Sequence, residues 1–167
     1  MALRVKRASK RSIIIGGIVG VIILVVAGLI VQGVTRQSDD STARPDYDTV
    51  LPNGKSISNL GGWDRVSPPS SAPVFAFTDS IDGVSVIVSQ QPLPDSFKGD
   101  VAKKVSEFAK AQSMTSELEA DGTKMYLGIS AKGPQSTVFT KNDLLILIKS
   151  QAKIEDKSWM AYVTSLK

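Results

Sequence analysis

One apolar segment constrains this sequence more than any other feature. From Ile13 to Val34 there is no charged side chain, and fifteen of these 22 residues are Ile, Val or Leu. As a helix the segment would extend about 33 Å, whereas the hydrocarbon core of a bilayer is about 30 Å thick. A helix this long and apolar cannot be hidden inside a small domain, so we predict that residues 12–34 form a transmembrane helix in the lipid bilayer.

The charges on either side of the apolar segment predict its orientation. Residues 1–11 contain only basic charges, whereas acids outnumber bases in residues 35–48. The basic residues are Arg4, Lys6, Arg7, Lys10 and Arg11. Because basic residues remain on the cytoplasmic side, we expect a plasma-membrane protein with a cytoplasmic tail and an extracytoplasmic C-terminal part. A cleaved signal peptide is the alternative, but its apolar region is shorter, about 7–15 residues, and ends at a small-residue cleavage site that is missing here.

Two glycines in the apolar segment raise the question of self-association. Gly16 and Gly20 have the G-x-x-x-G spacing that lets two membrane helices approach each other closely. The ordinary glycine content of a membrane helix explains the same residues. Both interpretations stay open.

The composition argues against several functional classes. The formal charge is +4, but residues 12–167 contain 15 basic and 16 acidic residues, so the excess lies in the tail and does not predict a nucleic-acid surface. The sequence has no Cys and no His, which excludes disulfides and cysteine nucleophiles and removes the usual ligands of structural zinc. We therefore predict no metal, no cofactor and no nucleic-acid partner.

Composition also predicts how the chain is divided. Residues 1–11 form the basic tail and residues 12–34 the apolar segment. Residues 35–60 are rich in Ser, Asp, Asn and Pro, which is typical of a flexible stalk. Residues 61–167 have the apolar periodicity of a folded domain that is large enough for one core.

Local patterns in residues 61–167 predict hairpins and two helices. The turn signals Asp82-Gly83, Asp121-Gly122 and Lys141-Asn142-Asp143 separate apolar or alternating segments. We expect strands at 74–78, 84–90, 115–120, 124–130, 135–140 and 144–150, and helices at 96–112 and 155–166. The residues at 144–148 are apolar on both faces, which favours a central strand. The order ββαββββα predicts an α+β fold with a small antiparallel sheet.

Several of these elements resemble the PsbP-like family. They are GGW (61–63), VFAFTD (74–79), VSVIVSQQPLP (84–94), MYLGIS (125–130), VFTKNDLLILI (138–148) and the final W-x-x-Y-V-x-S-L (159–166). The resemblance covers residues 61–167 and implies an exported α-β-α sandwich that accompanies a membrane assembly or is tethered in the envelope. It contains no functional motif, so it implies no binding residues.

The sequence favours binding over catalysis. Ser150 and Lys153 give an S-x-x-K spacing, but the companion motifs of Ser–Lys enzymes are missing. We therefore predict a non-catalytic binding or scaffold domain of the bacterial cell envelope, with an envelope protein or a wall component as its partner. Candidate contact residues are Tyr47 and Trp63. One alternative is an envelope hydrolase with a Ser/Lys or carboxylate site. Another is a sensor, but the eleven-residue tail leaves little room for an output domain.

Overall fold

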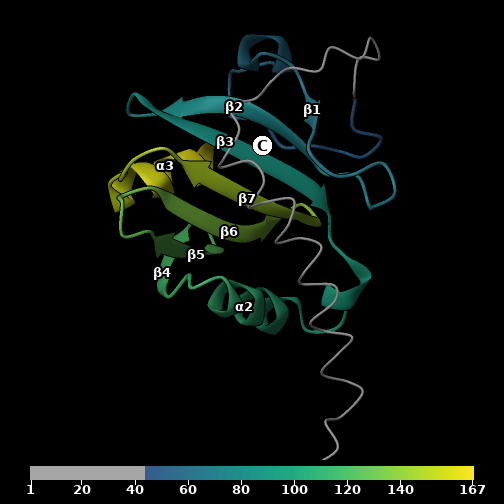
Figure 1. Ribbon diagram of the computed structural model, residues 1–167. Coiled ribbons are helices and arrows are strands. Elements are labelled where there is room, and N and C mark those ends of the chain that lie inside the picture. Colours follow the sequence, from purple (N-terminus) through teal and green to yellow (C-terminus); the bar gives the residue numbers. More distant parts are fainter. Residues whose placement is uncertain (1–43) are drawn as a thin grey trace, which may run out of the picture. The chain divides into compact units, whose positions relative to one another are not determined.

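The computed structural model describes residues 44–167, which contain one antiparallel sheet of seven strands and two short α-helices (Figure 1). The strands are β1 (Asp64–Arg65), β2 (Phe75–Ile81), β3 (Val84–Pro92), β4 (Ser116–Ala120), β5 (Thr123–Ile129), β6 (Gln135–Lys141) and β7 (Leu144–Ser150). The α-helices are α2 (Val101–Ala111) and α3 (Asp156–Ser165), and the 3-10 helices are η1 (Ile57–Leu60) and η2 (Asp95–Phe97). The order of strands in the sheet is β1-β2-β3-β7-β6-β5-β4.

Three tight turns set the register of the sheet, and they confirm the predicted hairpins. Ile81 pairs with Val84, Ala120 with Thr123, and Lys141 with Leu144. Each pair encloses a two-residue turn in which both residues have positive φ. This geometry matches the right-handed twist of paired strands and favours Asp-Gly and Asn-Asp at the turn. Strand β7 then pairs with β3 on one side and β6 on the other, as expected for a central strand.

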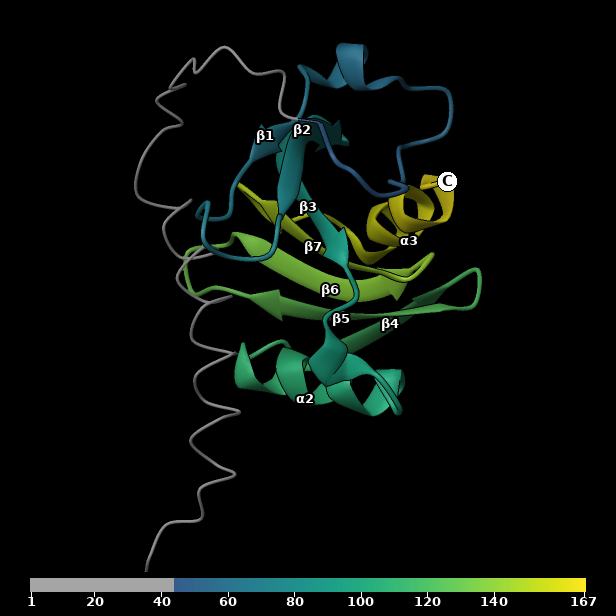
Figure 2. The ribbon, with the colours of Figure 1, turned by 90° about the vertical axis from the view of Figure 1, so that its right-hand side faces the viewer.

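The two helices cover opposite faces of the twisted sheet (Figure 2). On one face, Trp159, Tyr162 and Val163 of α3 pack into the main core with alternate residues of the strands. On the other face, α2 contacts β5 and β6 through a side that buries Val105 and Phe108. Both apolar faces of the central strands are therefore removed from water, which accounts for the burial of every residue from 144 to 148.

The predicted fold class is wrong. The described residues are mainly β, in a single curved seven-stranded sheet, and the order ββαββββα omitted β1. Strand β1 has only two residues, both exposed, so no alternation of polar and apolar side chains reveals it. The helix predicted at 96–112 is also shorter, because Gly99 has a φ of 98° and Asp100 caps α2 by accepting a hydrogen bond from Lys103 N at 3.0 Å.

The transmembrane part of the predicted fold class needs correction too. Within residues 44–167, no helix is long and apolar enough to cross a membrane. The expected transmembrane helix and signal anchor belong to residues 12–34, which lie outside the described residues. The same holds for the basic residues of the tail, for Gly16 and Gly20, and for Ile13 and Val34 at the ends of the apolar segment.

The last part of the expected stalk lies against the sheet. Val50 is 1% exposed and Leu60 6% exposed, and both belong to the main core. Leu51 and Lys167 exchange two backbone hydrogen bonds of 2.9 Å, and Asn53 N donates to Ser165 O at 2.7 Å. Residues 51–53 therefore pair with the C-terminal residues, and the folded unit begins before Gly61.

Candidate functional site

An open groove of about 1060 Å³, here called the N-terminal groove, lies along the first described residues. It is lined by Arg44, Pro45, Tyr47, Asp48, Thr49, Leu51, Ile57 and Trp63. Two short pieces of chain supply these residues: the segment 44–51, and η1 together with its connection to β1. The structure thus places both candidate contact residues, Tyr47 and Trp63, in one hollow, although whether they contact a partner stays a prediction.

Tyr47 is held by the sheet through its hydroxyl group and its ring. Its hydroxyl donates a hydrogen bond of 2.6 Å to the backbone oxygen of Gln90, and its ring lies 6.1 Å from the ring of Phe75. Burial raises the pKa of Tyr47 to about 12, so the hydroxyl is neutral at physiological pH. The ring is a fixed wall of the groove rather than a reactive group.

Trp63 is half-buried, and its inner edge rests on the core. Its ring meets that of Phe77 edge to face, with centroids 5.2 Å apart and an interplanar angle of 77°. This arrangement is favourable for two aromatic rings and limits the rotation of the indole. A rigid aromatic side chain that lines a groove loses little conformational entropy when a ligand binds.

Gln90 fixes the backbone on which the groove is built. Its side chain is 0% exposed and forms two hydrogen bonds with Val50, accepting from Val50 N at 3.0 Å and donating to Val50 O at 2.6 Å. The role of Gln90 was not predicted from the sequence, because a polar side chain in a strand usually faces water. One signal was available, since Gln90 continues the core row of Val84, Val86 and Val88 at alternate positions.

A second polar cluster joins three separate parts of the described chain. Asp79 of β2 accepts hydrogen bonds from Lys55 Nζ at 2.5 Å and from Tyr162 OH at 3.0 Å. The carboxylate also accepts from Ser80 N at 2.8 Å, and its side chain is only 4% exposed. Burial, aided by the nearby charge of Asp79, raises the pKa of Tyr162. Both carboxylate oxygens are occupied, so the cluster ties Lys55 and α3 to β2.

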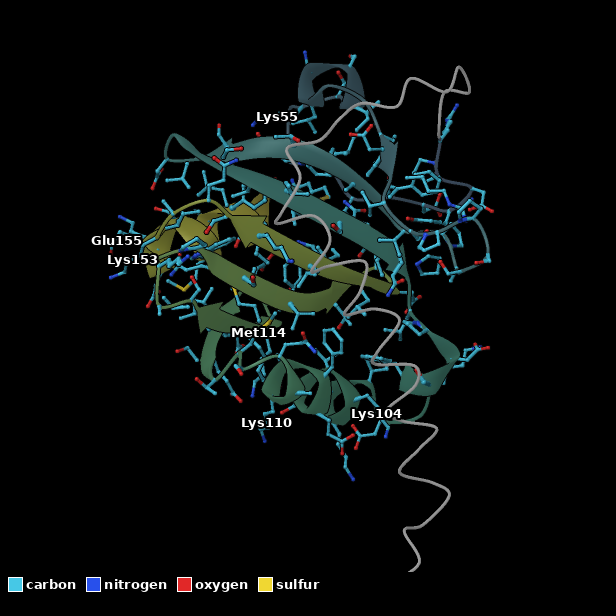
Figure 3. All side chains as sticks on the ribbon, in the orientation of Figure 1. Lys55, Lys104, Lys110, Met114, Lys153 and Glu155 are labelled. Carbon is cyan, nitrogen blue, oxygen red and sulfur yellow. The ribbon has the colours of Figure 1, made fainter. Side chains whose placement is uncertain are left out.

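The Ser150 hydroxyl of the S-x-x-K pair is engaged by the backbone. Ser150 is buried, and its Oγ accepts a hydrogen bond from Gln135 N at 3.0 Å and donates one to Ala152 O at 2.6 Å. Lys153 is exposed and lies with Glu155 on the outside of the connection between β7 and α3 (Figure 3). This geometry gives Ser150 a structural role, since a nucleophile needs a base within hydrogen-bond reach.

Charge is sparse in the N-terminal groove and is of both signs. Arg44 and Asp48 are exposed on its lining, while Leu51 and Ile57 are apolar and half-buried. Across residues 44–167, no three potential metal ligands gather in one place. The arrangement suits the recognition of a ligand with apolar and polar parts, because aromatic walls supply contact area and the charged rim supplies orientation.

Comparisons of the chain with protein-family models, with curated proteins and with solved structures find no match.

Proposed function

We propose that residues 44–167 act as a non-catalytic binding or scaffold domain of the bacterial cell envelope, and that the N-terminal groove receives an envelope protein or a wall component. One observation carries this proposal: Tyr47 and Trp63, each anchored on the core, line the same open groove. A preformed site with immobilised aromatic walls is typical of binding surfaces, because few side chains must be ordered on association.

The proposed location depends on the sequence. Basic residues precede the apolar segment 13–34 and acidic residues follow it, which favours an extracytoplasmic position for residues 44–167. From the sequence resemblance, we also propose that residues 61–167 are related to PsbP-like domains.

Photo-crosslinking in intact cells tests the binding function. A photoreactive amino acid at Thr49 would lie in the groove, whereas the same amino acid at Lys110 would lie on the exposed side of α2 (Figure 3). We expect a discrete crosslinked product from position 49 that is absent from position 110, and we expect the additional change Trp63→Ala to reduce it. Equal products from both positions, or none from position 49, would contradict the proposal.

A protease experiment tests the location independently. Ala131 and Lys132 are exposed in the loop between β5 and β6, where trypsin can cut after Lys132. Protease added to intact cells from which any outer barrier has been removed should cut the chain there. Protection in these cells together with cleavage after lysis would place the domain in the cytoplasm and would remove the envelope role.

A further inference from the structure

The sheet ends in a strand that is paired on one side only. Within the described residues, β4 is the last strand in the sheet order and pairs with β5 alone. The opposite edge is formed by β1, which has two residues, whereas β4 has five. Thr115, Ser116, Glu117 and Glu119 are all exposed, and within the described residues Glu117 and Glu119 make no backbone hydrogen bond outside the β4–β5 pair.

The hairpin geometry specifies which backbone groups this edge presents. Ala120 and Thr123 flank the two-residue turn and therefore exchange backbone hydrogen bonds. Bonded pairs alternate along the ladder, so the backbone groups of Leu118 also point toward β5. The N–H and C=O groups of Glu117 and Glu119 consequently point away from the sheet, with the spacing that another strand requires.

The side chains along this edge have a distinct pattern. Glu117 and Glu119 project from one face, where Lys124 forms an ion pair of 2.8 Å with Glu117. Leu118 points to the opposite face and packs against the main core, on the side where α3 contacts β4. An added strand would therefore place its alternate side chains beside carboxylates on one face and beside apolar groups on the other.

A second copy of this chain fits that pattern badly. If two β4 strands paired antiparallel about Leu118, Glu117 of each copy would lie opposite Glu119 of the other. Like charges directly opposite each other destabilise a strand pair. A strand with Lys or Arg at those positions would instead be attracted to them.

We propose that β4 is a strand-addition site that binds an extended segment of a partner protein, with basic residues at alternate positions and apolar residues between them. Backbone hydrogen bonds to Glu117 and Glu119 supply affinity, and their carboxylates select basic side chains. This site is separate from the N-terminal groove.

Binding of a synthetic peptide to the purified full chain tests the proposal. The probe is a capped peptide with the sequence Thr-Lys-Val-Lys-Val-Lys-Thr. The control peptide has Glu in place of each Lys. We expect the basic peptide to bind and the acidic peptide not to bind. On binding, hydrogen exchange should slow at the amides of Glu117 and Glu119, while the amide of Leu118 is already protected by β5.

Glu119→Pro is the sharpest variant, because it removes an outward N–H and leaves the ladder to β5 intact. We expect it to weaken peptide binding about tenfold or more, the equivalent of one lost hydrogen bond to a well-placed partner. The control Glu119→Gln keeps the N–H and loses one charge, so its loss should be smaller and should fade at high salt. Comparable binding by Glu119→Pro and by the original chain would overturn the proposal.

An N-methylated version of the basic peptide provides a test that does not depend on correct folding of the proline variant. Methyl groups on the backbone nitrogens that would face β4 block the added ladder without changing the protein. We expect this peptide not to bind. If it binds as well as the unmodified peptide, the attraction is charge alone and strand addition is wrong.

Discussion

At the scale of single residues, buried polar side chains hold the described chain together. Gln135 Oε1 accepts hydrogen bonds from Ile154 N at 2.6 Å and from Trp159 Nε1 at 3.0 Å. Gln90 of β3 binds Val50 in a related way: its Oε1 accepts from Val50 N and its Nε2 donates to Val50 O. In both cases a glutamine occupies a core position of a strand and binds a segment without regular pairing to that strand. Such segments carry backbone groups that need partners when they are buried.

Replacement of Gln90 by Leu should destabilise the protein although the volume is nearly unchanged. The change leaves the buried N–H and C=O of Val50 without partners, and each orphaned group costs about 1–3 kcal/mol. We expect the free energy of unfolding, measured with urea, to fall by about 2–4 kcal/mol. The control Gln151→Leu, at an exposed position, should change it by less than about 0.5 kcal/mol. Equal effects of the two changes would show that Gln90 does not clamp the segment.

Gly128→Ala tests close packing behind β5. A Cβ at this position would lie 3.0 Å from Met114 Cγ, 3.2 Å from Met114 Cα and 3.2 Å from Ser113 O. Two of these atoms are backbone, so the segment between α2 and β4 would have to move. We expect a loss of about 1–3 kcal/mol in the free energy of unfolding. Thermal unfolding of the variant beside Gly133→Ala, which meets no nearby atom but has positive φ, separates this clash from backbone strain.

At the scale of elements, the sequence predicted those strands and turns that depend on neighbouring residues in the chain. The Asp-Gly turns and the wholly apolar residues 144–148 placed the hairpins and the central strand correctly. Strand β1 was missed because two exposed residues carry no periodic signal, and the start of α2 was misplaced because Lys98 and Gly99 interrupt an otherwise helical stripe.

Strand β7 also contains Lys149, which makes stability depend on pH. Lys149 faces Ile87 on one neighbouring strand and Ser136 on the other. Burial lowers the pKa of Lys149 to about 8, below its ordinary value of 10.5. Between these values the unfolded chain binds the proton and the folded chain does not, so the free energy of unfolding should rise with pH.

Urea unfolding at a series of pH values from 7 to 10 measures this effect. The rise should be smaller or absent in Lys149→Met, which retains the length of the side chain. Above about pH 10 the raised pKa values of Tyr47 and Tyr162 act in the opposite direction, because the unfolded tyrosines lose protons first. A flat profile for the original chain between pH 8 and 10 would contradict the assignment to Lys149.

At the scale of the whole described unit, the features that were not predicted from the sequence depend on contacts between residues far apart in the chain. Tyr47 and Trp63 were identified as candidate contacts from their aromatic character. Their shared groove depends on Gln90, Phe75 and Phe77, which belong to other elements. The polar composition of residues 35–60 also concealed Val50, whose burial follows from its position beside Gln90 and not from its neighbours in sequence.

Two shortened chains test where the folded unit begins. A chain from Arg44 to Lys167 keeps the pairing of Leu51 with Lys167 and the burial of Val50 and Leu60. A chain that begins at Gly61 loses all of these, and each buried aliphatic side chain contributes about 1.5–3 kcal/mol. We expect the shorter chain to be less stable by at least about 4 kcal/mol. Equal urea midpoints would show that residues 44–60 add nothing to the fold.

The pairing of Leu51 with Lys167 has a practical consequence for engineering this protein. A tag fused directly after Lys167 would emerge beside Leu51, which lines the N-terminal groove, so a long hydrophilic spacer is needed to avoid disturbing the groove. The same proximity suits a circular permutation, in which a short linker joins Lys167 to the segment before Leu51. New ends could then be opened at the exposed loop of Ala131 and Lys132, far along the chain from both.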